Sequence, residues 1–132
     1  MDYNSLIEKA LDARKKAYSP YSSFSVGAAL LSDSGKIYTG CNIESASHTP
    51  TCCAERVAFF KAVSEGERSF EAIAVVGANT SDKDFGFCSP CGVCRQVMSE
   101  FCGDDFKIIL ADSQKNYKIF TLAELLPLNF KL

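Results

Sequence analysis

The sequence predicts an α/β protein, a three-layer α/β/α sandwich with a mixed five-stranded sheet. Three observations support this prediction. An amphipathic segment opens the chain, two apolar runs separated by turn residues follow it, and three further short apolar runs alternate with helical segments. The order is helix, two strands, helix, strand, helix, two strands and helix, so helices are expected on both faces of one sheet.

The first predicted helix covers residues 5–19. Ser5 and Glu8 match the capping-box pattern Ser-x-x-Glu and are expected to begin it. Pro20 is expected to end it, because proline cannot continue a helix. The apolar residues recur at i, i+3 and i+4 and give one apolar face: Leu6, Ile7, Ala10, Leu11, Ala17 and Tyr18.

A hairpin is predicted next. Residues 24–31 read FSVGAALL, a continuous apolar run that is typical of a buried strand, and residues 36–41 read KIYTGC. The Asp-Ser-Gly turn at 33–35 separates the two strands.

The second half of the chain alternates helices and strands. A helix at 53–63 is apolar around most of its girth, which indicates burial on several sides and suggests contacts between subunits. Ser89 and Pro90 suit the N-cap and first position of a helix that runs to Phe101. The other predicted segments are strands at 72–78, 106–110 and 117–120, a polar loop at 79–87, and a last helix opened by a Thr121–Glu124 capping box.

Length and composition predict a single domain over residues 1–132. The 14 Lys and Arg against 16 Asp and Glu leave a net charge of -2, which argues against a nucleic-acid-binding protein. No apolar run reaches the roughly 18 residues of a membrane span, and the first residues lack a signal-peptide pattern. The chain is therefore expected in the cytoplasm, with neither nucleic acid nor membrane as a partner.

Seven cysteines are too few, and odd in number, for a disulfide-built domain. Cys91 and Cys94 stand at i and i+3 at a predicted helix start, so both thiols can face one point. Cys53 stands at another helix start, and helix N-termini favour thiolates. Three sulfur ligands leave the fourth position of a tetrahedral zinc ion free for water, which is typical of a catalytic site.

Two charged residues follow Cys53 closely. Three thiolates outweigh the charge of Zn2+, so Arg56 is suited to compensate by a hydrogen bond to a ligand sulfur. Glu55 is placed to exchange protons with the water and the substrate as a general acid/base. The sequence therefore predicts Glu55 as the catalytic residue and one zinc ion per chain held by three cysteines, Cys53, Cys91 and Cys94.

These residues resemble the zinc-dependent cytidine deaminase family in its small, three-cysteine, homotetrameric form. The resemblance rests on Cys-Ala-Glu-Arg at 53–56, Ser-Pro-Cys-x-x-Cys-Arg-Gln at 89–96, Phe-x-Val-Gly-Ala-Ala at 24–29, Asn-Ile-Glu at 42–44 and Leu-Leu-Pro at 125–127. The deaminase signature likewise combines a ligand-x-Glu motif with Pro-Cys-x-x-Cys and a glutamate that is not a ligand. The resemblance implies a cytidine deaminase-like fold and a homotetramer with sites at subunit interfaces.

The resemblance also implies an activity: hydrolytic deamination of cytidine and deoxycytidine to uridine and deoxyuridine plus ammonia, as in pyrimidine salvage. Zinc hydroxide would attack C4 while Glu55 carries protons to N3 and to the leaving ammonia. The implied substrate contacts are Phe24 beside the base, Asn42 and Glu44 at the ribose hydroxyls, the Ala54 backbone and the Ser89 carbonyl at the base edge, and Phe130 over the base of a neighbouring subunit. Glu44 would repel a 5′-phosphate, which favours a nucleoside as substrate.

Three alternatives remain open from the sequence. The same zinc machinery could serve another aminopyrimidine nucleoside, such as blasticidin S. Cys52 or Cys88 could complete a structural four-cysteine zinc module without catalysis. Cys91 and Cys94 could form a redox dithiol. Packing is the default for the cysteines outside the motif, which are Cys41, Cys52, Cys88 and Cys102, and His48 stands where many relatives have Tyr.

Overall fold

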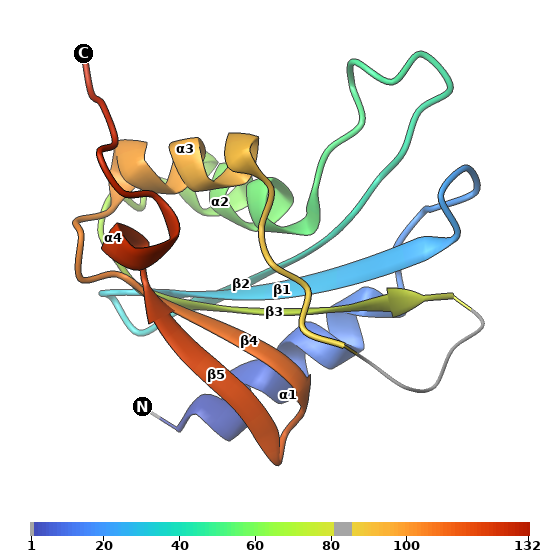
Figure 1. Cartoon of the computed structure of the whole chain (residues 1–132), viewed down its shortest axis with the longest axis horizontal. Coiled ribbons are helices and arrows are strands. Elements are labelled where there is room, and N and C mark those ends of the chain that lie inside the picture. The colour runs from blue at the N-terminus through green and yellow to red at the C-terminus, as the bar shows by residue number, and fades with distance from the viewer. Residues whose placement is uncertain (1, 81–85) are drawn as a thin grey trace.

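The computed structural model describes residues 2–80 and 86–132. Its elements are α1 (Tyr3–Arg14), β1 (Phe24–Ser32), β2 (Ile37–Cys41), α2 (Ala54–Ser64), β3 (Phe70–Asn79), α3 (Gly92–Phe101), β4 (Lys107–Ser113), β5 (Asn116–Thr121) and α4 (Leu122–Leu125). Figure 1 shows α1 below the sheet and α2, α3 and α4 above it. This arrangement confirms the predicted three-layer α/β/α sandwich.

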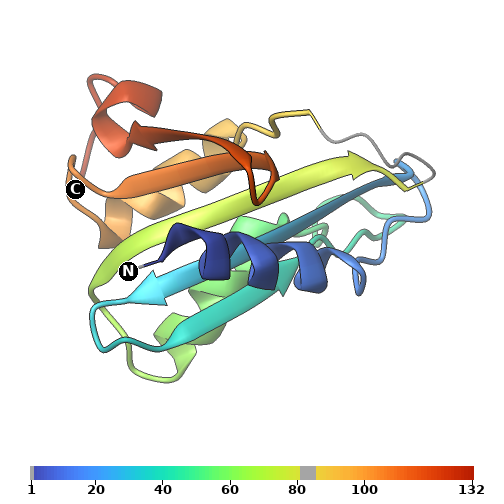
Figure 2. The same ribbon diagram turned by 90° about the horizontal axis from the view of Figure 1, so that it is seen from below.

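The five strands form one mixed sheet in the order β2-β1-β3-β4-β5. The β1–β2 hairpin, the β1–β3 pair and the β4–β5 pair are antiparallel, whereas β3 and β4 run parallel. Figure 2 shows the sheet from the side that α1 covers. Because β3 and β4 are parallel, the chain must cross between them, and α3 makes this crossover.

The continuous apolar run of β1 follows from its position at the centre of two cores. Ala28 and Leu30 face the core under α2 and α3, and Ala29 and Leu31 face the smaller core under α1. Side chains alternate between the faces of a strand, so a strand covered on both faces must be apolar at every position.

The packing of α2 on the sheet depends on Gly40 of β2, because a Cβ there would lie 2.3 Å from the Ala54 carbonyl oxygen.

The first helix differs from its prediction at both ends. Asp2 is the N-cap and its side chain accepts a hydrogen bond from Asn4 N, so the expected capping box at Ser5 is wrong. The helix ends at Arg14 rather than at Pro20. Its extension is prevented by Tyr18, whose backbone pairs with the segment after β2 through hydrogen bonds to Asn42 and Glu44.

The start of α3 also differs from its prediction. The N-cap is Cys91, not Ser89, and Pro90 precedes the helix. The Ser89 hydroxyl instead accepts a hydrogen bond from Arg95. The end at Phe101 and the Thr121–Glu124 capping box are confirmed. Part of the predicted polar loop at 79–87 falls on residues 81–85, which lie outside the described residues.

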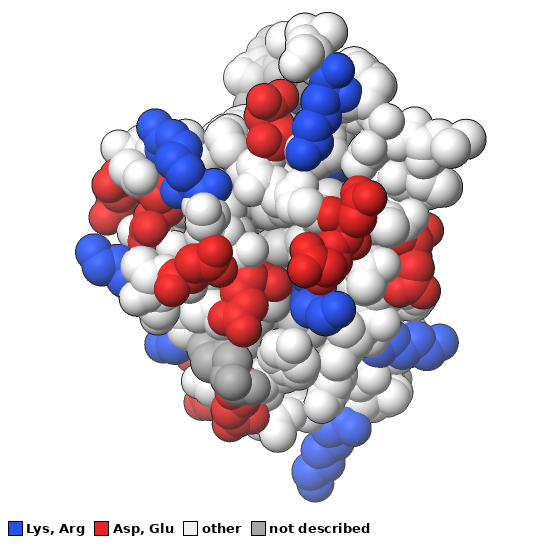
Figure 3. Space-filling model, turned by 90° about the vertical axis from the view of Figure 1, so that its left-hand side faces the viewer, with Lys and Arg blue, Asp and Glu red and all other residues white. Residues whose placement is uncertain are grey.

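The distribution of surface charge and the length and polarity of the helices bear on possible partners. On the face shown in Figure 3, acidic and basic side chains are interspersed rather than segregated into a basic patch. Within the described residues, every helix is too short or too polar to cross a bilayer.

Candidate active site

The candidate site lies where α2 and α3 begin, on the same face of the sheet. Cys53 is the N-cap of α2 and Cys91 is the N-cap of α3, while Cys94 lies in the first turn of α3. The two helices start side by side because β3 carries the chain from the end of α2 back to this edge of the sheet. The predicted convergence of two helix starts, distant in sequence, is therefore present.

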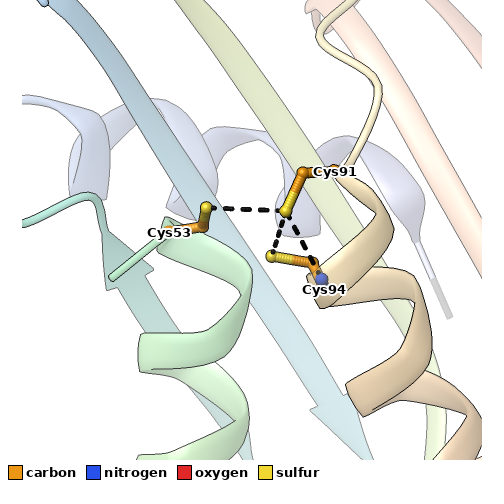
Figure 4. A group of neighbouring side chains, drawn as sticks. All are labelled: Cys53, Cys91 and Cys94. Atoms are coloured by element: carbon orange, nitrogen blue, oxygen red, sulfur yellow. Dashed lines mark hydrogen bonds between the residues drawn. The ribbon is translucent and has the colours of Figure 1, made fainter. Parts of the chain in front are cut away.

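The three thiols point toward one another, as Figure 4 shows. The Sγ atoms of Cys53 and Cys91 are 3.8 Å apart, and those of Cys91 and Cys94 are 3.4 Å apart. Zinc–sulfur bonds of about 2.3 Å in a tetrahedron place neighbouring sulfurs about 3.8 Å apart. The spacing and the soft donor set therefore fit one zinc ion.

Two further cysteines could have closed the site, and neither does. All three ligand atoms of Cys53, Cys91 and Cys94 lie within 4.8 Å of one another, and among the described residues neither Cys52 nor Cys88 joins this group. The arrangement therefore presents three sulfurs and favours a site with an open fourth position over a closed four-cysteine module.

The pKa values of the clustered thiols differ from one another. Hydrogen bonds from Cys94, Arg56 and Cys91 lower the pKa of Cys53 to about 5, against the opposing effect of burial. The pKa of Cys94 is raised, first by its hydrogen bond to the Cys53 sulfur and then by burial. Cys53 thus already favours the thiolate form that a metal requires.

Arg56 supports the sulfur of Cys53, as the sequence predicts. Its Nη2 donates a hydrogen bond of 3.4 Å to Cys53 Sγ, and this bond raises the pKa of Arg56 above its usual value. Arg56 Nε is buried and has no hydrogen-bond partner among the described residues. The guanidinium is therefore a fixed positive charge next to the metal ligands.

Replacing Arg56 should weaken zinc binding without removing a ligand. Arg56→Gln is expected to lower zinc affinity by about 10- to 100-fold, because it removes the charged donor behind Cys53. Competition with a chromophoric chelator measures this affinity. Arg68→Gln is a matched control, since Arg68 lies just beyond α2 and donates only to the Val63 and Glu67 carbonyls among the described contacts. Equal zinc affinities for the two variants would show that Arg56 does not strengthen zinc binding through Cys53.

Glu55 occupies the second position of α2 and is only 4% exposed. Burial raises the pKa of its carboxyl group to about 7, and the negative charge of Cys53 adds to this effect. Its own backbone N–H and the Cys94 thiol act in the opposite direction, as hydrogen-bond donors to the carboxylate. The carboxyl group therefore lies next to the thiol cluster in an environment that permits both protonation states near neutral pH.

A pocket of about 250 Å³ opens beside the thiols. Its mostly apolar surface brings together nearly all of the predicted substrate-binding residues with Glu55 and two of the three clustered cysteines, Cys53 and Cys91. The lining residues are Ser22, Phe24, Val26, Asn42, Glu44, Thr51, Cys52, Cys53, Ala54, Glu55, Cys88, Ser89 and Cys91. Phe24 is 39% exposed at the first position of β1, so it belongs to the pocket wall rather than to a core.

The polar end of the pocket is built by Asn42 and Glu44. The buried Asn42 side chain accepts from Val26 N and donates to the Phe24 carbonyl, which leaves one amide N–H unused by these two bonds. Glu44 accepts hydrogen bonds from the Tyr21 and Ser22 backbone and from the Ser22 hydroxyl. The Ser22 hydroxyl bond, first among these, lowers the pKa of Glu44, so the carboxylate is charged.

Arg95 holds the segment that precedes α3. It donates hydrogen bonds to the Pro90 carbonyl, the Ser89 hydroxyl and the Leu125 carbonyl, at 2.8, 2.6 and 2.6 Å. The sequence places Arg95 in a motif but predicts no role for it. Ser22, Thr51 and Val26 are not predicted as lining residues, because no local pattern separates such side chains from ordinary loop and strand residues.

Phe130 is the one predicted substrate contact that lies away from this pocket. It is 65% exposed, it does not line the pocket of its own chain, and its carbonyl accepts a hydrogen bond from Gln96. His48 lines a neighbouring hollow of about 300 Å³ that shares Ser22, Glu44 and Thr51 with the pocket.

Comparison with known proteins agrees with this site. Residues 1–110 match the sequence family described as the cytidine and deoxycytidylate deaminase zinc-binding region. The chain is 52% identical over 127 residues to a cytidine deaminase of Sporosarcina psychrophila, covering 96% of this chain and 90% of the relative. It is 51% identical over the same length to a cytidine deaminase of Halalkalibacterium halodurans, covering 96% of this chain and 92% of that relative.

Solved structures agree as well. A crystal structure of cytidine deaminase from Burkholderia pseudomallei superimposes with a TM-score of 0.89 at 45% identity, covering 98% of this chain and 100% of that one. Matches of this extent in sequence and in fold, together with three thiols at zinc-ligand spacing, establish the family. The chain belongs to the cytidine and deoxycytidylate deaminases, with a zinc-binding site formed by its three clustered cysteines.

Proposed function

We propose that this protein is a single-domain enzyme that deaminates cytidine and deoxycytidine to uridine and deoxyuridine, with release of ammonia. The observation that carries the proposal is a pocket lined by Glu55 and by Cys53 and Cys91 of the three-thiol cluster, with a carboxylate and an amide at its other end. When bound, a zinc ion supplies the Lewis acid that activates water for attack on a ring carbon. Substrate binding and proton transfer are carried out by side chains and backbone groups of this chain.

Glu55 is the proton carrier in this proposal. Hydrolysis forms a bond between water oxygen and C4 and breaks the bond between C4 and the amino nitrogen. The two water protons must leave the oxygen, one reaching N3 and the other the departing amine. A buried carboxyl group whose pKa is raised to about 7 can accept a proton and return it, which is the requirement for a general acid/base.

Backbone groups around the thiols suit the edge of the base. Ala54 is the first residue of α2, where the helix itself does not use the backbone N–H, so this donor is free for an acceptor on the ring. The Ser89 carbonyl lies in the segment held by Arg95 and suits the amino group of the substrate. Phe24 offers its ring to the face or edge of the pyrimidine.

Asn42 and Glu44 suit the sugar of the nucleoside. A carboxylate accepts and an amide N–H donates, so together they match the hydroxyl groups of a ribose. Glu44 carries a negative charge that a 5′-phosphate would oppose, which favours a nucleoside over a nucleotide.

Glu44→Gln should raise the KM for cytidine by about tenfold with a smaller effect on kcat, because a hydrogen bond to a charged group is replaced by a neutral one. Steady-state kinetics with 2′,3′-dideoxycytidine should be nearly insensitive to the substitution, since that substrate lacks the hydroxyls. Glu67→Gln is the matched control: Glu67 also accepts from a serine hydroxyl, Ser34, but lies outside the pocket. An equal KM increase for both substrates would show that Glu44 stabilises only the Tyr21–Ser22 turn and does not bind the sugar hydroxyls.

We also propose a homotetramer in which Phe130 covers the pocket of a neighbouring subunit. Phe130 is exposed and outside the pocket of its own chain, which is what a residue donated to another subunit requires. Phe60, 49% exposed on α2, gives a further apolar surface for subunit contact. Light scattering of the purified protein tests this: a monomer at enzymatic concentrations would overturn it.

A reducing compartment suits this enzyme, so we place the reaction in the cytoplasm, as a step of pyrimidine salvage. The three thiolates bind a metal only while they remain reduced, and all seven cysteines are free thiols in the described structure.

The decisive experiment combines metal analysis with an assay. Purified protein should contain about one zinc per chain, and the absorbance of cytidine should fall as uridine forms. Blasticidin S, tested in parallel, separates the alternative substrate from the proposed one. Thiol–disulfide exchange activity that survives complete chelation of zinc would instead favour a Cys91–Cys94 redox dithiol.

A further inference from the structure

The wall of the pocket beside Phe24 is formed by Cys88, a residue that no motif marks. Cys88 is half-buried and lines the pocket directly before Ser89. Its position depends on Gly77 of β3. A Cβ on Gly77 would lie 2.9 Å from Cys88 Sγ, 3.0 Å from Cys88 Cβ and 3.0 Å from Cε2 of Phe24. The thiol and the aromatic ring therefore rest together on the bare backbone of Gly77.

The segment that carries Cys88 is anchored on both sides. Gly86 forms an antiparallel bridge with Gly77, and the Phe87 ring lies under Lys118 Nζ at 4.9 Å from its centroid. On the other side, Arg95 holds Ser89 and Pro90. With these anchors, Cys88 has little freedom to move aside for a larger ligand.

Cys88 behaves as a small neutral side chain at this place. Burial raises its pKa to about 12, with contributions from the negative charges of Glu55 and Cys53. A neutral thiol packs like a small hydrophobic group, and its closeness to Glu55 and Cys53 places it at the reactive end of the pocket.

From this geometry we propose that Cys88, seated on Gly77, is a specificity-determining residue that limits the size of substituents at C5 of the pyrimidine ring. The inference rests on the proposed function. If the Ser89 carbonyl accepts from the amino group on C4, then the preceding residue, Cys88, faces the adjacent ring position, C5. Removing the sulfur enlarges the pocket there, and adding a methyl group at Gly77 pushes Cys88 and Phe24 into it.

The test compares Cys88→Ala and Gly77→Ala, which should shift selectivity in opposite directions. Binding of uridine and 5-methyluridine to the zinc-loaded enzyme is measured by calorimetry, and kcat/KM is measured for cytidine and 5-methylcytidine. Cys88→Ala should shift both ratios by about tenfold toward the methylated ligand, which is the scale of one methyl group in a pocket. Gly77→Ala should shift them toward the unmethylated ligand and raise KM, with the zinc content unchanged.

Cys102→Ala is the matched control. Cys102 is a buried cysteine at the C-cap of α3, away from the pocket, so its truncation should cost stability and leave both ratios unchanged. Unchanged ratios in Cys88→Ala, with uridine still bound, would overturn the inference and leave the proposed function intact. A wild-type chain that neither binds uridine nor deaminates cytidine would overturn the proposed function itself.

Discussion

Glu55→Gln should reduce kcat for cytidine by at least about 100-fold while the zinc content stays near one per chain. The amide is nearly isosteric with the carboxyl group, so the packing of this 4% exposed side chain is retained. What is lost is a group that accepts and returns a proton, and among the described residues that line the pocket Glu55 is the only carboxylate at the thiol end. Stopped-flow or absorbance assays measure the rate, and metal analysis of the same sample measures the zinc.

The control for this experiment is Glu65→Gln. Glu65 is the exposed C-cap of the same helix, so the same chemical change at the other end of α2 should leave the rate unaltered. Turnover near the wild-type rate in Glu55→Gln would refute the role of Glu55 as proton carrier. Loss of zinc together with activity would assign Glu55 to the stability of the site instead.

Cys94→Ser should abolish both zinc binding and activity. Cys94 is only 1% exposed and its sulfur lies 3.4 Å from that of Cys91, so the substitution removes one of three ligands from a cluster that no other cysteine of the described residues joins. A serine hydroxyl is a much harder and less acidic ligand than a thiol, so the two remaining sulfurs are left to bind zinc alone. Metal analysis should give near-zero zinc per chain, with circular dichroism reporting whether the fold persists.

Cys102→Ser provides the comparison for that variant. It makes the same exchange at a cysteine that is 7% exposed at the far end of the same helix. It should lower stability and keep both zinc and activity. A Cys94→Ser protein that still holds one zinc would show that Cys94 is not a ligand, and would reopen the choice of Cys52 or Cys88.

Helices and strands agree with their predictions where a local sequence pattern determines them. The continuous apolar run of β1 predicts a buried strand, and the Thr121–Glu124 box marks the start of α4. The predicted boundaries are wrong where long-range contacts determine them. Tyr18 leaves the helical pattern because its backbone pairs with Asn42 and Glu44, and Ser89 does not cap α3 because Arg95 takes its hydroxyl.

The pairing of Cys91 with Cys94 and the placement of Glu55 beside Cys53 could be predicted from the chain alone because their spacing is local, whereas Cys53 and Cys91 are 38 residues apart and meet only in the fold. Cys91 and Cys94 face one point from the first turn of a helix whatever the rest of the molecule does. The pocket is different, because its walls come from β1, the loop after β2, the start of α2 and the segment before α3. Only the sheet order decides which of these come together, and only close packing at Gly77 decides that Cys88 and Phe24 share one wall. Local geometry is encoded in neighbouring residues, whereas the shape of a cavity depends on contacts between segments far apart in the sequence.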